Sequence, residues 1–313
     1  EAEALTEFFD APADGPRMIG SVKPNIGHTG AAAGLASLVK ASLCIYHEIL
    51  PAMEGRDVPR AWLRDRANGP RRASVSAMTL DGGCAHVVLE SAEDDARQDP
   101  VDLRQPLGAR TTAVFGISCD NVTSLSERLA SLRQSASTAS GGIERLARSW
   151  FDSTDPETTN HPLALAIVAR DRDELLRAVT EAENRLRANP SSEIRGRYGI
   201  FYSPNPLGRS GEVAFVFPGS GNHYEDMGRG VAIHWPEVLR SLDAETGRLK
   251  SQMISRPLVA EERSHDTDGD PLGTIFNQVS HGIVMSDLLR ALGVEPSAAI
   301  GYSLGESTAM FAL

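Results

Sequence analysis

The stretch Ser297-Ala298-Ala299-Ile300-Gly301-Tyr302-Ser303-Leu304-Gly305, near the carboxyl end of the chain, decides the fold that the sequence predicts. Ser297–Ile300 reads as a short strand, and a helix is expected from Leu304 onward. A serine between two glycines at such a strand-to-helix turn is the pattern of a nucleophile elbow, because the glycines permit the sharp bend that presents the hydroxyl. The helix start also offers backbone N–H groups to a developing oxyanion. A lone pattern of this kind also arises by chance, as a tight turn at a helix start.

A second stretch gives the elbow a partner. Val213–Phe217 is a continuous apolar run that predicts a buried parallel strand, and Pro218-Gly219-Ser220-Gly221-Asn222 then turns the chain. Phe215–Gly221 resembles the opening strand and loop of malonyl-type acyltransferases, and Gly301–Gly305 resembles the nucleophile elbow of that family.

This resemblance implies roles for six residues. Ser303 would attack a malonyl thioester of coenzyme A and pass the acyl group to a phosphopantetheine thiol. The backbone N–H groups of Ser220 and Leu304 would form the oxyanion hole. The substrate would be contacted by Tyr302, Asn222 and His223. At the position of Ser220 the family usually has a glutamine, and at the position of Tyr302 it usually has a histidine. Ser220 can still provide a backbone N–H donor, whereas the change at Tyr302 concerns the choice of extender unit.

A third stretch, Gly20–Gly34, resembles the last catalytic stretch of β-ketoacyl synthases; it reads Gly20-Ser21-Val22-Lys23-Pro24-Asn25-Ile26-Gly27-His28-Thr29-Gly30 before an alanine-rich run. The resemblance adds His28 and Lys23 to Ser303 as catalytic residues. His28 would stay neutral beside a helix N-terminus and donate a hydrogen bond to the enolate oxygen formed by decarboxylation, while Lys23 would organise the site through its charge. The alternative is a histidine that caps a helix and an exposed lysine.

The order of these stretches is the layout of a type I polyketide synthase, a ketosynthase followed by an acyltransferase. The predicted fold class is α/β, in three parts. Residues 1–92 would be the C-terminal part of a thiolase-like ketosynthase, and 93–210 a small α/β linker module with β-α-β-α-β order. Residues 211–313 would be the N-terminal part of an α/β-hydrolase-like acyltransferase. A helix over 29–47, capped by Thr29 and apolar nearly all round, is expected to be buried.

The intact protein is therefore expected to load malonyl units onto an acyl carrier protein and to condense them by decarboxylative Claisen chemistry. The phrases at 217–222 and 301–306 resemble the synthases of polyunsaturated fatty acids and glycolipid chains. The resemblance implies that the ketosynthase cysteine and first histidine precede Glu1, and that the acyltransferase histidine and arginine follow Leu313. His223 and His281 are expected to be surface or packing residues and not the catalytic base. The 313-residue chain alone is therefore not expected to turn over malonyl groups. The alternatives are a non-catalytic, carrier-docking scaffold or a lone serine hydrolase.

The composition of the chain excludes some classes of binding partner. The net charge of −11 argues against nucleic acids and anionic membranes, and no apolar stretch approaches the roughly 18 residues of a membrane span. Three cysteines, Cys44, Cys84 and Cys119, match no zinc or redox spacing, so we expect reduced thiols in the cytoplasm, no metal and no bound cofactor. The expected partners are acyl carrier protein domains, malonyl-CoA and, through the intact ketosynthase, a second copy of the protein.

Two further segments are not expected to be binding sites. Asp266–Asp270 is read as a solvated loop rather than a calcium site. The arginines of 56–72 are read as a solvated or salt-bridged surface rather than a carrier-docking patch.

Overall fold

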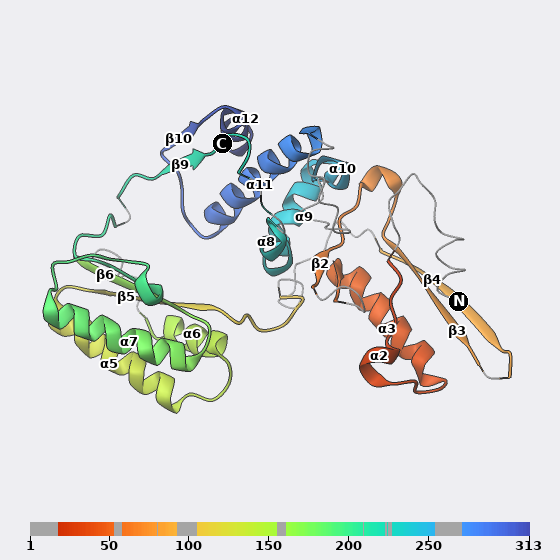
Figure 1. Ribbon diagram of the computed structural model, residues 1–313, viewed down its shortest axis with the longest axis horizontal. Helices are drawn as coiled ribbons and strands as arrows, with labels where there is room; N and C mark the ends of the chain where they lie inside the picture. Colours follow the sequence, from red (N-terminus) through yellow and green to blue (C-terminus); the bar gives the residue numbers. More distant parts are fainter. Residues whose placement is uncertain are drawn as a thin grey trace. The chain divides into compact units, whose positions relative to one another are not determined.

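The computed structural model (Figure 1) describes residues 18–52, 58–79, 81–92, 105–154, 161–208, 210–222, 224, 227–253 and 271–313. The fold is mixed α/β, as predicted. By its contacts, the chain divides into two compact units. One unit consists of Leu107–Ala214 with Glu295–Ala298, and the other collects the remaining segments. The predicted limits of the three functional parts, at 92 and 210, stay predictions.

The first unit is a four-stranded antiparallel sheet in the order β5-β6-β8-β7 with helices on one face (Figure 1). Its strands are β5 (Ala113–Cys119), β6 (Leu163–Ala169), β7 (Ile194–Arg195) and β8 (Ile200–Ser203). Its helices are α5 (Val122–Thr138), α6 (Ile143–Asp152), α7 (Arg172–Ala188) and the short η3 (Arg197–Gly199). The predicted order of strands and helices is confirmed for β5, α5, α6, β6, α7 and β8, whereas the short β7 and η3 were not predicted.

Strand alternation and helix caps explain this unit. Along β5 and β6 every second residue is buried, so each strand turns one face toward the helices. The Asn121 side chain accepts a hydrogen bond from the Ser124 N–H at the start of α5, and Asp171 accepts one from the Glu174 N–H at the start of α7. The helices and strands close one continuous core, in which Phe115 and Ile167 are fully buried.

The amino-terminal part of the second unit holds α2 (Lys23–Ile26), α3 (Ala32–His47) and the antiparallel hairpin of β3 (Arg72–Met78) and β4 (Cys84–Glu90). Short elements lie between them: β1 (Ile49–Leu50), β2 (Arg60–Ala61) and η1 (Arg66–Asn68). Two expectations are wrong here. Ala31, not Thr29, caps α3. The N–H groups of Ala32 and Ala33 donate hydrogen bonds to the Thr29 and Gly30 carbonyls, so the chain is already turning at Thr29.

The second wrong expectation concerns the burial of α3. Only Ala33 and Ile45 are buried on it, whereas Leu35, Val39 and Leu43 are exposed by 67%, 59% and 50%. These three residues recur at every fourth position and so share one face of the helix. Within the described residues, the β3–β4 hairpin covers another part of the helix surface and leaves this face open.

The carboxyl-terminal part carries the elbow on a two-stranded sheet, β9 (Ala214–Phe217) and β10 (Ala298–Gly301). Its helices are α8 (Arg229–His234), α9 (Pro236–Glu245), α10 (Leu249–Met253), α11 (Pro271–Ala291) and α12 (Leu304–Ala312). The Ser297 N–H bonds to the Val213 carbonyl at 2.8 Å, and the Tyr302 N–H bonds to the Phe217 carbonyl at 3.2 Å. Both strands therefore run in the same direction. In the described residues, none of these helices is both long and apolar enough to cross a membrane.

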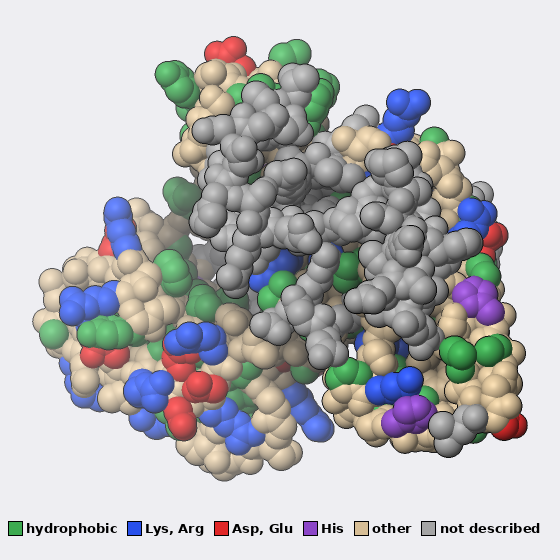
Figure 2. Space-filling view, turned by 45° about the vertical axis from the view of Figure 1, so that its right-hand side comes forward, with side chains coloured by type: hydrophobic (Ala, Val, Ile, Leu, Met, Phe, Trp, Pro, Cys, Tyr) green, Lys and Arg blue, Asp and Glu red, His purple; other side chains and the backbone are tan. Residues whose placement is uncertain are grey.

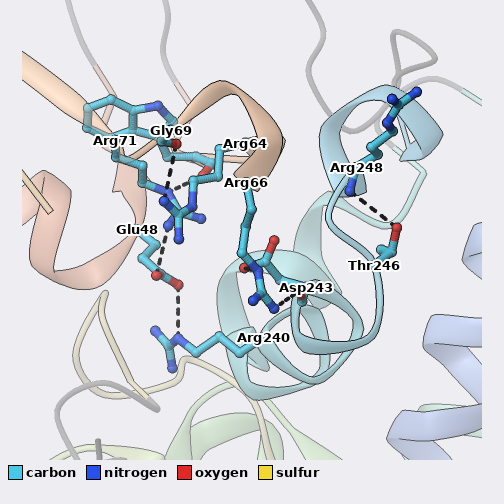
Figure 3. Close-up of polar contacts among 10 residues, drawn as sticks. Glu48, Arg64, Arg66, Gly69, Arg71, Arg240, Asp243, Thr246 and Arg248 are labelled. Atoms are coloured by element: carbon cyan, nitrogen blue, oxygen red, sulfur yellow. Dashed lines mark hydrogen bonds and ion pairs between the residues drawn. The ribbon is translucent and has the colours of Figure 1, made fainter. Parts of the chain in front are cut away.

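An ion-pair network joins segments far apart in sequence within this unit (Figure 3). The Glu48 carboxylate accepts from Arg71 and from Arg240, each at 3.0 Å, and the Arg71 Nε–H bonds to the Trp62 carbonyl at 2.7 Å. Arg66 pairs with Asp243 at 3.2 Å. Of the arginines described in this segment, Arg64, Arg66, Arg71 and Arg72 are ion-paired or bonded to carbonyl groups, and Arg60 is buried with a contact to the Met18 sulfur, so they are not gathered as a free docking patch. Arg56 lies outside the described residues, as does Asp266–Asp270.

Basic and acidic side chains lie intermixed on the face shown in Figure 2. In the four-stranded unit, ion pairs along the helix surfaces account for this, among them Arg133–Glu183 and Arg185–Glu181. Among the described residues of this face, the mixed signs leave no extended positive patch of the kind that binds nucleic acid.

Candidate functional site

Ser303 lies at the sharp turn between β10 and α12, where the sequence predicts it. Its backbone has φ 54° and ψ −117°, a conformation that side-chain-bearing residues rarely adopt. The residue is exposed, and its hydroxyl makes no capping bond to the helix that follows. Strained backbone of this kind costs about 1–3 kcal/mol and persists only where surrounding contacts impose it. The serine therefore presents a free hydroxyl at a strained turn.

The two glycines of the motif make the turn possible. A Cβ on Gly301 would lie 2.3 Å from the Gly305 carbonyl group, and a Cβ on Gly305 would lie 2.1 Å from the Phe217 carbonyl oxygen. Both distances are far inside van der Waals contact. The strand, the turn and the first turn of α12 thus come together at a spacing that only glycine permits.

The loop after β9 lies against the elbow. A Cβ on Gly219 would come within 2.8 Å of the Tyr302 ring and 3.1 Å of the Tyr302 carbonyl oxygen, so the two turns are in contact. The Asn222 Nδ2 donates to the Gly219 carbonyl at 2.8 Å. Among the described residues, the backbone N–H groups of Ser220 and Leu304 have no acceptor. The structure therefore brings together the serine and both loops that sequence reasoning paired with it.

The residues predicted to contact the substrate, and the two histidines near the site, lie in different surroundings. Tyr302 is 77% exposed beside the serine, and Asn222 directs its amide nitrogen to its own loop. His223 lies outside the described residues. His281 is buried, and its ring nitrogens lie 2.8 Å from the Asn277 carbonyl oxygen and 2.6 Å from that of Met227. Burial lowers the pKa of His281, which suits a packing histidine.

Sequence reasoning missed one contact of this loop. The Gln278 side chain, on α11, donates from Nε2 to the carbonyl oxygens of Pro218 and Gly219. It is only 7% exposed. The signal in the sequence is weak: adjacent amides, Asn277 and Gln278, stand inside a mostly apolar helix, where buried polar groups need partners.

His28 and Lys23 lie apart from any such arrangement. The His28 Nδ1 accepts from the Gly30 N–H at 3.2 Å, so a neutral ring carries its proton on Nε2 and can donate there. His28 is exposed on the loop between α2 and α3, and Lys23, also exposed, opens α2. These contacts are local, and within the described residues they form no enclosed site.

Two of the three cysteines are disfavoured as alternative nucleophiles. Burial raises the pKa of Cys44 and of Cys119, which disfavours their thiolates. Cys84 is exposed at the start of β4. Among the described residues, no group of three or more His, Cys, Asp or Glu side chains could hold a metal ion.

Comparison with known proteins places these sites in context. The family model described as the C-terminal domain of beta-ketoacyl synthase matches residues 1–55. Polyketide synthase GfsA of Streptomyces halstedii is 32% identical over 99% of this chain, which covers 4% of that protein. Spectinabilin polyketide synthase system protein NorB of Streptomyces orinoci is 30% identical over 100% of the chain and 15% of its own length. Mycoketide-CoA synthase of Mycobacterium tuberculosis is 30% identical over 99% of the chain and 7% of its own length.

The chain thus spans no more than 15% of these relatives. Among solved structures, the acyltransferase domain of ZmaA gives a TM-score of 0.47 at 17% identity, over 64% of this chain and 44% of that one. The ketosynthase from module 6 of the bacillaene synthase of Bacillus subtilis gives 0.26 at 25% identity, over 64% and 36%. These two structural likenesses are too distant to carry an argument about function.

Proposed function

We propose that this chain is a ketosynthase–acyltransferase segment of a type I polyketide synthase and that it carries the acyl-loading serine of that enzyme. Ser303 accepts a malonyl group from malonyl-CoA and delivers it to the phosphopantetheine thiol of an acyl carrier protein. The proposed acyl transfer needs no cofactor bound by this segment. The observation that carries the proposal is the geometry of the elbow: Ser303 is exposed with φ 54°, the Gly219 loop contacts the adjacent Tyr302, and the N–H groups of Ser220 and Leu304 have no acceptor in the described chain.

The chemistry follows from these groups. The Ser303 oxygen attacks the thioester carbonyl and gives up its proton to a base, and the negative charge that forms on the carbonyl oxygen is met by the N–H groups of Ser220 and Leu304. Collapse of the intermediate expels the coenzyme A thiolate and leaves a malonyl ester on the serine. Attack by the carrier thiol reverses these steps. The resemblance implies that the base is a histidine beyond Leu313.

The ketosynthase part supplies the condensation. Decarboxylation of a carrier-bound malonyl thioester generates an enolate, and the Nε2–H of neutral His28 donates to its oxygen. Lys23 organises the site through its positive charge and does not act directly. The hydrogen bond from the Gly30 N–H to the His28 Nδ1 supports this role, because it favours the tautomer that donates from Nε2.

The finer assignment is to the synthases of polyunsaturated fatty acids and glycolipid chains. The sequences Phe-Pro-Gly-Ser-Gly-Asn at 217–222 and Gly-Tyr-Ser-Leu-Gly-Glu at 301–306 support it. Such a protein works in the cytoplasm as a homodimer through its complete ketosynthase.

The test is loading of the full-length protein with radiolabelled malonyl-CoA. We predict that Ser303→Ala abolishes labelling, since loss of an acyl-transfer nucleophile costs on the order of 10⁴–10⁶ in rate, while the thermal unfolding midpoint changes little because the side chain is exposed. Ser307→Ala, an exposed serine one turn further along α12, is the control and should label as the wild type does. Unchanged labelling of Ser303→Ala would overturn the assignment and favour a scaffold.

A further inference from the structure

Gln278 reaches from α11 to the loop that carries Ser220. Its Nε2 lies 3.2 Å from the Pro218 carbonyl oxygen and also donates to the Gly219 carbonyl oxygen. Both partners can only accept, so the nitrogen of the side-chain amide must face the loop. The Asn222 Nδ2 donates to the same Gly219 oxygen at 2.8 Å. Two side-chain amides therefore hold one carbonyl group of this loop.

That carbonyl belongs to the peptide unit whose other end is the Ser220 N–H. A peptide unit is planar and trans, so its C=O and N–H point in opposite directions. Fixing the Gly219 oxygen on the α11 side therefore fixes the direction of the Ser220 N–H away from it. Donors on the carbonyl also polarise the peptide and strengthen its N–H as a donor. The contact bears on the geometry and on the strength of the proposed oxyanion donor together.

The helix that carries Gln278 is itself tied to both sides of the site. One turn further along, the buried His281 contacts the Met227 carbonyl at the far end of the same loop. A Cβ on Gly282 would lie 2.1 Å from Thr308 Cγ2 and 3.3 Å from the Phe217 ring, so α11 packs directly against α12 and β9. The amide is thus held in a fixed relation to the helix that starts at the elbow.

We propose that Gln278 is a positioning residue for acyl transfer: it anchors the Gly219–Ser220 peptide so that the Ser220 N–H meets the oxyanion. This inference rests on the proposed function of Ser303. Gln278 acts through the peptide and does not touch the acyl group. Its loss should therefore lower the rate of the loading step and leave the binding of malonyl-CoA unchanged.

The first test replaces the amide by an apolar group of similar size. In the full-length protein, Gln278→Leu should lower the rate constant for loading from malonyl-CoA by roughly 10- to 100-fold, because loss of an entire oxyanion donor costs 10²–10³ and here the donor is misdirected rather than removed. The malonyl-CoA concentration for half-maximal rate should not change. Gln134→Leu, an exposed glutamine on α5, is the matched control and should load at the wild-type rate.

The second test uses pH and stays decisive where Gln278→Leu fails to fold. In Gln278→Glu, the carboxylate repels the two carbonyl oxygens, whereas the protonated acid can donate to one of them. Burial raises the pKa of such a carboxyl. The loading rate of Gln278→Glu relative to wild type should therefore rise as the pH falls from about 8 to about 5.5. A side chain that only fills space would give a flat ratio.

The outcomes separate the two proposals. The positioning role would be overturned if Gln278→Leu loaded at the wild-type rate, or if it changed only the malonyl-CoA concentration for half-maximal rate. It would also be overturned if Gln278→Glu loaded more slowly than the wild type by the same factor at every pH. Labelling of Ser303→Ala in the same assay would instead overturn the acyltransferase assignment. Loss of labelling in Ser303→Ala, together with a lowered rate constant in Gln278→Leu, supports both.

Discussion

Helices α5 and α3 each carry an apolar face along one side, and the two faces are buried to different extents. On α5, Leu125, Leu129 and Leu132 follow one face and are fully buried against the sheet. On α3, Leu35, Val39 and Leu43 follow one face just as regularly and are at least half exposed. A period near 3.6 thus tells which residues share a face, whereas burial depends on a partner for that face. The four-stranded unit supplies this partner from its own residues, and the described surroundings of α3 do not.

The largest expected effect tests this contrast directly. Leu129→Ala removes a side chain with no exposed surface, so we expect it to lower the free energy of unfolding of the four-stranded unit by about 2–5 kcal/mol. The same change at Leu35, which is 67% exposed, should cost less than about 0.5 kcal/mol. Denaturant unfolding followed by amide hydrogen exchange on each unit measures both effects. Equal losses at the two positions would mean that the α3 face is covered in solution.

The second expected effect concerns the elbow, where the second unit is closely packed. Gly305→Ala places a methyl group 2.1 Å from the Phe217 carbonyl oxygen, so β9 and α12 must separate. We expect a loss of about 2–3 kcal/mol, typical of overpacking, with faster hydrogen exchange of the Tyr302 amide, which bonds to Phe217. Gly230→Ala in α8 is the control, since no atom lies within 4 Å of its Cβ position. If Gly305→Ala exchanged as slowly as Gly230→Ala, the close approach of strand and helix would be refuted.

The elbow and the helices α5 and α3 also show which features the sequence could predict and which it could not. The strand–turn–helix at Ser303 and every major element of the four-stranded unit follow from local pattern, because caps, alternation and glycine turns act over a few residues. The contacts of Gln278 with the β9 loop and of Glu48 with Arg240 join positions far apart in the chain. No local pattern encodes such pairs. The burial of α3 was mispredicted for the same reason, since composition reveals an apolar face and says nothing of what covers it.

A third, smaller effect is expected at the ion-pair network. Glu48 sits at the end of α3 with φ 59° and bridges Arg71, whose side chain is 6% exposed, and Arg240, at 20%. Glu48→Gln keeps the shape and removes the charge, so two partly buried guanidinium groups lose their shared carboxylate. We expect a loss of about 1–3 kcal/mol, the range for hydrogen bonds to charged groups. The matched control is Glu90→Gln, whose pair with Arg72 is more than half exposed and should contribute under 1 kcal/mol. Equal losses would show that the network is as solvated as the hairpin pair.

The smallest expected effect returns to the unit that closes its own core. Asp171 caps α7 by accepting the Glu174 N–H at 2.7 Å, and Asn121 caps α5 in the same way at 2.9 Å. Asp171→Ala should cost about 1 kcal/mol, and Asp171→Asn, which keeps an accepting oxygen, only a few tenths. The fluorescence of Trp150, buried in this unit, reports its unfolding in denaturant. If the alanine and asparagine variants were equally stable, the hydrogen bond would contribute nothing, and α7 would owe its stability to packing of its apolar face alone.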